Sequence, residues 1–150
     1  MAKTHNPWHM VPGINNVGSY QVSGQPFAEG QIDASAGTGY RLQFPQVTQW
    51  VQIYNYDNVN NCRVGFSSLG IQGTSYAGGA TGTFTGTNFF MVPASGSSGP
   101  GVSPVLKLKV SELHLKGSDD VHVVGGLTNI LPRSCSGSTG PSWSGSAGVG

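Results

Sequence analysis

The stretch that decides the fold runs from Val105 to Leu127 and reads VLKLKVSELHLKGSDDVHVVGGL. Apolar side chains occupy every second position on either side of Gly117-Ser-Asp-Asp120, and polar side chains stand between them. A period of two predicts antiparallel β-strands that bury one face and leave the other to water or to a partner. The side chains expected in the core are Leu106, Leu108, Leu113, Leu115, Val121 and Val123.

The same alternation appears earlier in the chain. Residues 47–56 form the strongest early strand, and apolar groups on both of its faces predict a central strand that is covered on both sides. Residues 57–61 are Asp-Asn-Val-Asn-Asn, which favours a turn. Residues 62–66 are then expected to return as the partner strand of a hairpin. The buried positions expected in this pair are Val51, Ile53, Val64 and Phe66.

Shorter strands are predicted at residues 40–44 and 88–93. Between them lies a Gly-, Ser- and Thr-rich stretch over 67–87, long enough to hold an irregular edge strand. No segment combines a 3.6-residue period with good helix formers and an N-cap. About seven or eight short strands joined by irregular loops imply an all-β fold of the β-sandwich type.

The chain divides into one domain and two arms. Residues 1–25 are read as an extended N-terminal arm, residues 26–133 as the β-sandwich domain, and residues 134–150 as a Gly/Ser-rich C-terminal arm. Arms of this composition bury too little apolar surface to offset their chain entropy, so we expect neighbouring subunits to hold them. The residues expected to bind those partners are Trp8, Pro12 and Trp143; the alternative is that the tryptophans fold back on their own domain.

Composition limits the classes of partner. Only 9% of the residues are charged, against about 25% in ordinary globular proteins, and the net charge is +1. The scattered Lys and Arg residues give no basic patch for nucleic acid, and no apolar run is long enough for a membrane helix. The first ten residues lack the apolar core of a signal peptide, so we expect synthesis in a cytoplasm. A surface with so little charge predicts a chain that is largely covered in an assembly.

Cysteine and histidine give no clear metal site. Cys62 alternates with apolar residues and is read as a buried free thiol, whereas the state of Cys135 stays open. His5 and His9 have a zinc-ligand spacing for a helix, but Pro7 between them disfavours a helix. His114 and His122 are expected to face each other across neighbouring strands on the exposed side of the sheet.

Candidate catalytic groups are equally sparse. The pairs Glu29/Asp33 and Glu112/Asp119 could be imagined as acid and base carboxylates, but nothing in the sequence singles them out. Asp119-Asp120 reads as part of a turn, because a calcium site needs more oxygen ligands at close spacing. Neither a nucleophile elbow nor a phosphate-binding glycine loop is present. We therefore expect no catalytic residues, no metal, no cofactor and no enzymatic activity.

One pattern resembles a known family. It runs V-Q-I-Y-N from Val51, C-R-V-G-F-S from Cys62, N-F-F-M-V-P from Asn88, L-K-L-K-V-S-E-L-H-L-K-G from Leu106 and V-H-V-V-G-G-L-T from Val121. This pattern resembles small virion proteins of tailed bacteriophages, many of which decorate or cement the capsid. The resemblance covers residues 47–131 and implies a β-sandwich, often jelly-roll-like; it does not account for the arms.

The resemblance implies a capsid decoration or cement protein on the surface of the virion, made in the host cytoplasm. Its expected partners are the major capsid protein and copies of itself. The alternative is a tail, fibre or head-fibre protein that contacts the host surface, with possible affinity for glycans. An enzyme such as a glycan hydrolase would need a pocket with convergent titratable groups.

Overall fold

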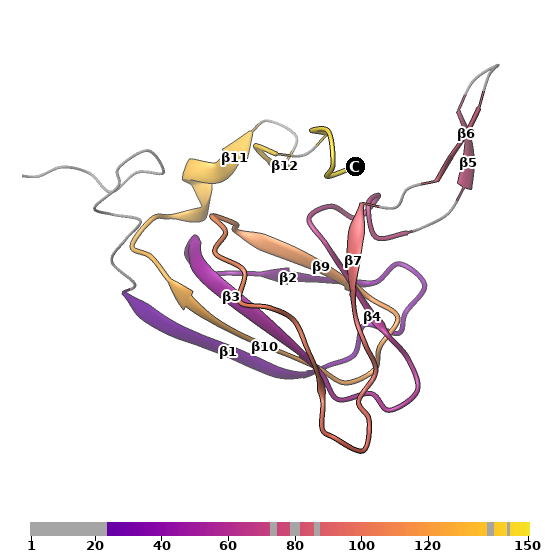
Figure 1. The fold of residues 1–150 in the computed structure, drawn as a ribbon. Helices are drawn as coiled ribbons and strands as arrows, with labels where there is room; N and C mark the ends of the chain where they lie inside the picture. The colour runs from indigo at the N-terminus through magenta and orange to yellow at the C-terminus, as the bar shows by residue number, and fades with distance from the viewer. Residues whose placement is uncertain (1–23, 73–74, 79–81, 86–87, 138–139, 144) are drawn as a thin grey trace, which may run out of the picture.

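A computed structural model describes residues 24–72, 75–78, 82–85, 88–137, 140–143 and 145–150. Its secondary structure consists of short strands and one 3₁₀ turn (Figure 1). In chain order the elements are β1 (Gln25–Ile32), β2 (Tyr40–Gln43), β3 (Thr48–Asn55), β4 (Cys62–Gly65), β5 (Ser75–Gly78), β6 (Gly82–Thr85), β7 (Phe89–Val92), β8 (Gly101–Val102), β9 (Glu112–Lys116), β10 (Val121–Leu127), η2 (Pro132–Cys135), β11 (Ser136–Gly137) and β12 (Gly140–Pro141). The expectation of an all-β fold is confirmed.

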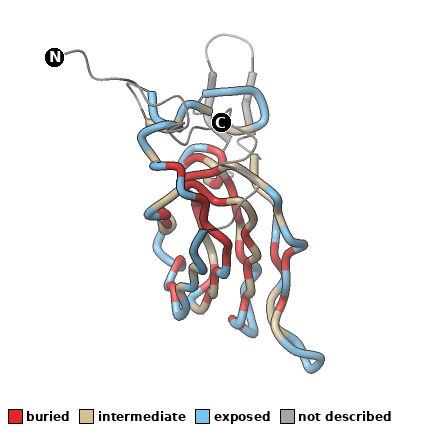
Figure 2. The backbone as a smooth tube through the Cα atoms, turned by 90° about the vertical axis from the view of Figure 1, so that its left-hand side faces the viewer, coloured by how far each residue is buried: buried red, intermediate tan, exposed pale blue. Residues whose placement is uncertain are grey.

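Two four-stranded antiparallel sheets form the body of the molecule. One has the strand order β1-β10-β3-β8 and the other β2-β9-β4-β7; we call them the first and the second sheet. Two small pairs are added, β5 with β6 and β11 with β12. Apolar side chains from both large sheets meet in one core cluster, which is consistent with the expected β-sandwich. Buried positions run along the strands, while the connecting loops are mostly exposed (Figure 2).

Alternation along the strands gives the core. Seven of the ten expected side chains are almost fully buried, and each contributes on the order of 2 kcal/mol to the free energy of unfolding. They are Val51, Ile53, Val64, Leu113, Leu115, Val121 and Val123. The remaining three, Phe66, Leu106 and Leu108, are half-buried and pack against the edge of this core.

Residues 105–110 do not form the regular strand that their alternation predicts. Only Leu106 makes a ladder bridge, to Val51 of β3. Pro104 has no N–H to donate, and the Ser103 hydroxyl accepts a hydrogen bond from the backbone N–H of Ile53 at 2.9 Å. Further along, the Thr48 hydroxyl donates to the carbonyl of Leu108 at 2.7 Å. Side-chain hydrogen bonds therefore replace the ladder, and the segment follows the edge of β3 irregularly.

The predicted hairpin between residues 47–56 and 62–66 is wrong, because β3 and β4 lie in different sheets. The chain crosses between the sheets through residues 56–61. The Asp57 carboxylate accepts hydrogen bonds from the backbone N–H groups of Val59 and Asn60 at 2.7 and 2.9 Å. The Asn55 amide group donates to the carbonyl of Asn60 at 2.8 Å. These bonds form a compact crossover instead of a two-strand turn.

The turn at residues 117–120 also crosses between sheets, since β9 and β10 belong to different ones. Gly117 has a φ of +100° there, a conformation that favours glycine. The expected pairing of His114 with His122 is therefore wrong. His114 faces Arg41 and Gly65 in the second sheet, whereas His122 pairs with Tyr54 in the first.

Most of the expected C-terminal arm is described, and it folds back on its own domain. Cys135 and Trp143 pack with the buried side chains of Val47 and Ile130 in a second small cluster. The Trp143 indole N–H donates to the carbonyl of Phe66 at 3.1 Å. The structure thus favours folding back over an anchor in a neighbour for Trp143. Trp8 and Pro12 lie outside the described residues.

Candidate functional site

The outer side of the first sheet carries an unusual surface. Register pairs Gly126 of β10 with both Pro26 and Trp50, Val124 with both Ala28 and Gln52, and Tyr54 with both His122 and Val102. Val121, Val123, Val51 and Ile53 point inward, so their neighbours in the strands point outward. We call this outer surface the uncharged face; its residues are Pro26, Ala28, Gly30, Trp50, Gln52, Tyr54, Val102, His122, Val124 and Gly126. None of them is Asp, Glu, Lys or Arg.

The uncharged face is partly apolar and accessible. Val102 and Val124 are 44% and 36% exposed, and Trp50 and Tyr54 are half-buried. The expectation that β3 is covered on both sides is therefore wrong for the described part of the chain. Gly126 stands between Pro26 and Trp50 without a side chain, which leaves a shallow hollow of about 400 Å³. Hollowed apolar surfaces of this kind are typical of interaction sites.

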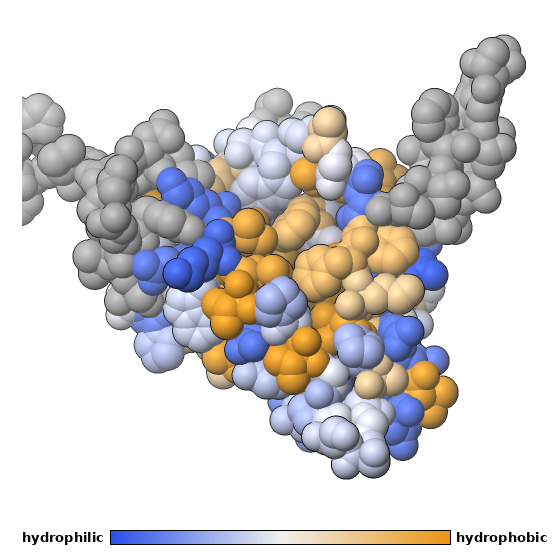
Figure 3. Space-filling view, viewed as in Figure 1, coloured by the Kyte–Doolittle hydropathy of each residue, from blue (hydrophilic) through white to orange (hydrophobic). Residues whose placement is uncertain are grey.

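Apolar side chains continue from this face onto the edge of the sandwich. Val105 is 51% exposed, beside the half-buried Leu106 and Leu108. In Figure 3 apolar atoms gather in the middle of the view, where the segment after β8 runs along β3. Lys107, which is exposed, and Lys109, which is half-buried, flank Leu108 in the sequence. Exposed apolar side chains thus occur both on the uncharged face and along this edge.

The second sheet carries a different kind of site on its outer side. Glu112 and His114 lie two residues apart on β9 and so point to the same side of the sheet, and Arg41 of β2 pairs with His114. The Arg41 Nε and Nη2 donate to Glu112 Oε2 at 3.0 and 2.5 Å. His114 Nε2 lies 3.0 Å from Glu112 Oε1. Glu112 and His114 are buried, whereas the Arg41 side chain is 52% exposed.

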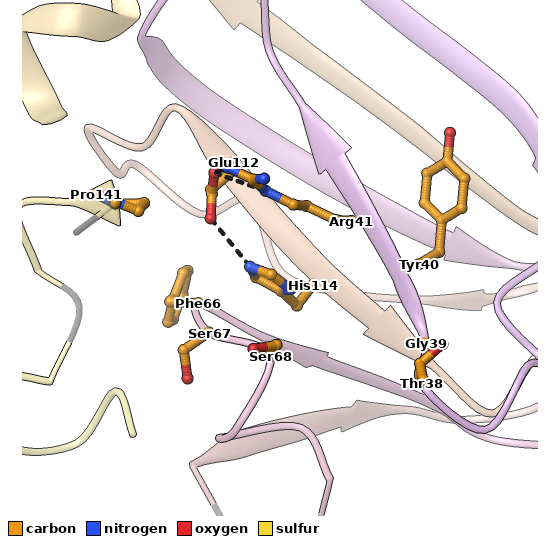
Figure 4. A pocket seen from close by; sticks show the side chains of 11 residues that line it. Thr38, Gly39, Tyr40, Arg41, Phe66, Ser67, Ser68, Glu112, His114 and Pro141 are labelled. Atoms are coloured by element: carbon orange, nitrogen blue, oxygen red, sulfur yellow. Dashed lines mark hydrogen bonds and ion pairs between the residues drawn. The ribbon is translucent and has the colours of Figure 1, made fainter.

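Two hollows of about 360 and 270 Å³ adjoin these three side chains. Both are lined by Arg41, Glu112, Gly140 and Pro141, so they meet beneath β12. Figure 4 shows Glu112 between Arg41 and His114, with Pro141 opposite and Phe66 beside His114. We call the two hollows together the polar groove. A carboxylate held by a guanidinium and an imidazole in a groove can recognise a ligand by hydrogen bonds.

The carboxylates considered from the sequence do not form acid–base pairs. Glu29 accepts a hydrogen bond of 2.9 Å from the Tyr40 hydroxyl, and Asp33 caps its own turn through Ser35. Hydrogen bonds from Ser35 lower the pKa of Asp33. Asp119 lies against Asp57, whose negative charge raises the pKa of Asp119. Glu29 therefore bonds Tyr40 rather than Asp33, and Glu112 bonds Arg41 and His114 rather than Asp119.

Both thiols are buried and free. Burial raises the pKa of Cys62 to about 11, and it raises the pKa of Cys135 as well. Within the described residues no cluster of three or more His, Cys, Asp and Glu side chains is close enough to hold a metal ion. His5 and His9 lie outside these residues. No helix in the described part of the chain is long and apolar enough to cross a membrane.

Sequence reasoning missed the Arg41–Glu112–His114 cluster. The spacing of Glu112 and His114 on an alternating strand places them on one side, and this signal was available. Arg41 is 71 residues away from Glu112, and only the pairing of β2 with β9 brings it in. The uncharged face was equally hidden, because it depends on which strands become neighbours.

No family model matches the chain, and searches among curated proteins and solved structures found no match either.

Proposed function

We propose that this chain is a non-enzymatic virion structural protein, a decoration or cement protein that binds and stabilises the assembled head of a bacteriophage. The observation that carries the proposal is the strand order. With the β5–β6 and β11–β12 pairs set aside, eight strands are shared between two sheets in the orders β1-β10-β3-β8 and β2-β9-β4-β7. We take this order as support for a jelly-roll-like fold, in which two Greek keys fold over each other. Viral capsid domains commonly use that architecture.

The uncharged face supplies the surface for such binding. The strand residues of this face carry no Asp, Glu, Lys or Arg, so covering them loses little hydration energy; the nearest carboxylate, Asp120, stands at the border and bonds His122. Trp50, Tyr54, Val102 and Val124 offer apolar contact area. Binding that is specific for the assembled lattice stabilises the lattice by mass action. Many copies on one shell add avidity. The proposed partners are the major capsid protein and neighbouring copies of this chain.

The alternative is a tail, fibre or head-fibre protein that contacts the host surface. The polar groove favours this alternative, because a structural protein that only covers a lattice has no need of a groove with a buried carboxylate and imidazole. Jelly rolls also serve as lectin domains.

The test uses phage particles that contain this chain. Mass spectrometry of purified particles establishes its presence, and cryo-electron microscopy locates it. Particles stripped of the protein are then offered recombinant wild type, Val102→Asp, Val124→Asp, or the control Leu131→Asp, whose parent side chain is 42% exposed outside the uncharged face. We expect the first two variants to rebind heads at least tenfold more weakly than the wild type and the control. Density at the tail tip would support the alternative, and absence from particles would overturn both.

A further inference from the structure

We propose that the polar groove is a binding site for a neutral oligosaccharide. The inference stands on the groove itself and is independent of whether the uncharged face binds a capsid. The groove is elongated, since its two hollows continue from one side of the Arg41–Glu112 pair to the other beneath β12. An extended ligand of several linked rings fits this shape better than a single compact molecule.

The central carboxylate is arranged to accept a further hydrogen bond. Glu112 Oε2 takes both hydrogen bonds from Arg41, whereas Oε1 takes one from His114. A carboxylate oxygen has two lone pairs, so Oε1 retains one acceptor position. The Arg41 guanidinium carries five N–H donors and directs two of them to Glu112, and half of the side chain is exposed. An acceptor and a donor fixed next to each other match the adjacent hydroxyl groups of a sugar ring.

Charge and lining select the class of ligand. One guanidinium and one carboxylate cancel at the centre of the groove, so there is no net charge to attract a phosphate, a nucleic acid or an anionic lipid. Thr38, Ser67 and Ser68 line one hollow, and Ser111 and Ser136 line the other. The hydroxyl groups of Ser67 and Ser136 already donate to the carbonyls of Val149 and Pro132, so Thr38, Ser68 and Ser111 are the hydroxyl residues for a ligand. The half-buried Phe66 lines the first hollow and offers apolar contact to the C–H face of a sugar, whereas Phe44 at the second hollow is buried in the core. Alternating hydroxyl and apolar surface is the chemistry of neutral polysaccharides.

The groove is also held in shape before any ligand enters. Glu112 and His114 are buried, and their mutual hydrogen bond fixes both side chains. The chain that contributes Gly140 and Pro141 is tied down by the hydrogen bond from Trp143 to the carbonyl of Phe66. Prior ordering of this kind lowers the entropy cost of binding. It also gives a reporter, because the Trp143 indole N–H is bonded to a residue that lines the groove.

The test titrates the ¹⁵N-labelled full chain with maltohexaose, cellohexaose and N-acetylchitohexaose, each to about 10 mM, which nearly saturates a site with a Kd of about 1 mM. We expect saturable shifts for at least one of them in the Trp143 indole N–H and in the amides of the groove residues. Glu112→Gln and Arg41→Lys should each raise the Kd of that sugar about tenfold, since both keep the size but weaken the hydrogen bonding. Asp120→Asn, in the crossover before β10 and outside the groove, should leave the Kd unchanged.

Two outcomes would contradict the oligosaccharide site. If none of the three sugars shifts the groove resonances, the proposal is wrong. It is equally wrong if the shifts occur but remain the same in a folded Arg41→Lys protein, which circular dichroism verifies. Rebinding of the same variants to stripped phage heads separates the two proposals, because Arg41→Lys should rebind heads like the wild type.

Discussion

The hydroxyl group of Ser118 donates a hydrogen bond of 2.7 Å to Asn55 Oδ1, and both side chains are fully buried. Ser118 lies in the crossover between β9 and β10, and Asn55 ends β3. The amide group of Asn55 also donates to the carbonyls of Asn60 and Pro93 at 2.8 and 3.1 Å. A single side chain therefore joins three connections at one end of the sandwich.

Asn55→Ala should lower the free energy of unfolding by about 3 kcal/mol, because it leaves several buried polar groups without partners. Urea titration followed by tryptophan fluorescence measures this change. The control is Asn58→Ala in the same crossover, where the side chain is exposed and the expected change is within about 0.5 kcal/mol. Equal effects at the two positions would show that the buried hydrogen bonds add nothing.

A second prediction concerns the approach of two backbones at Gly101. A Cβ atom there would lie 1.8 Å from the carbonyl oxygen of Pro93. Gly101→Ala should therefore lower the free energy of unfolding by about 2 kcal/mol or more, since the backbone of β8 must move. Gly96→Ala is the matched control, because nothing lies within 4 Å of a Cβ atom at that position. Thermal unfolding of both variants tests the contrast, which fails if their midpoints coincide.

A third prediction concerns acid stability. Hydrogen bonds from the backbone N–H groups of Asn60 and Val59 hold the pKa of Asp57 far below its ordinary value. A carboxyl group with a lowered folded-state pKa stabilises the fold above its unfolded pKa of about 3.9 and loses that contribution as the pH falls. Asp119 acts with the opposite sign, because the charge of Asp57 raises its pKa and protonation relieves the repulsion.

The pKa of Asp57 is shifted more than that of Asp119. The urea midpoint of the wild type should therefore decrease as the pH is lowered from 5 to 2, the range about the unfolded pKa of Asp57. Asp57→Asn keeps an acceptor oxygen but has no charge to lose, and its midpoint should fall less steeply. Parallel pH profiles for the two proteins would refute the assignment of acid sensitivity to Asp57.

A fourth prediction uses the buried thiols. Because burial raises the pKa of Cys62 to about 11 and also raises that of Cys135, neither thiol should react with a disulfide reagent at pH 8 in the native protein. Both should react once guanidinium unfolds the chain. Any slow labelling under native conditions requires transient unfolding, so it should be faster in Gly101→Ala. Rapid labelling of one thiol in the folded wild type would contradict its burial.

A fifth prediction addresses the C-terminal segment. Trp143→Phe removes the hydrogen bond to the carbonyl of Phe66 but keeps an aromatic ring, so the free energy of unfolding should fall by about 1 kcal/mol. Hydrogen exchange of the amides at 140–149 should become faster, while that of β3 and β10 stays slow. Fast exchange of 140–149 already in the isolated wild type would instead support an arm that needs a neighbour.

The sequence predicts the buried faces better than the connections between strands. Alternation at Leu113, Leu115, Val121 and Val123 is a local property of each strand, and it places these side chains correctly. The crossovers after Asn55 and Lys116 depend on side-chain hydrogen bonds to residues far along the chain, so they resemble hairpin turns in sequence. The contact between Arg41 and Glu112 could not be predicted for the same reason, because it depends on the pairing of β2 with the distant strand β9.

The pairing of β1 with β10 has a consequence for the timing of folding. Gln25 lies opposite Leu127, so the first strand of the sandwich finds its neighbour only when the last strand has been synthesised. A nascent chain on the ribosome holds β1 with no partner for most of translation, and such non-local closure is slow. The sandwich can therefore close only once β10 has been synthesised. A cell that produces many copies at once keeps a pool of open chains with an unpaired strand edge, which is the state most exposed to aggregation and to chaperones.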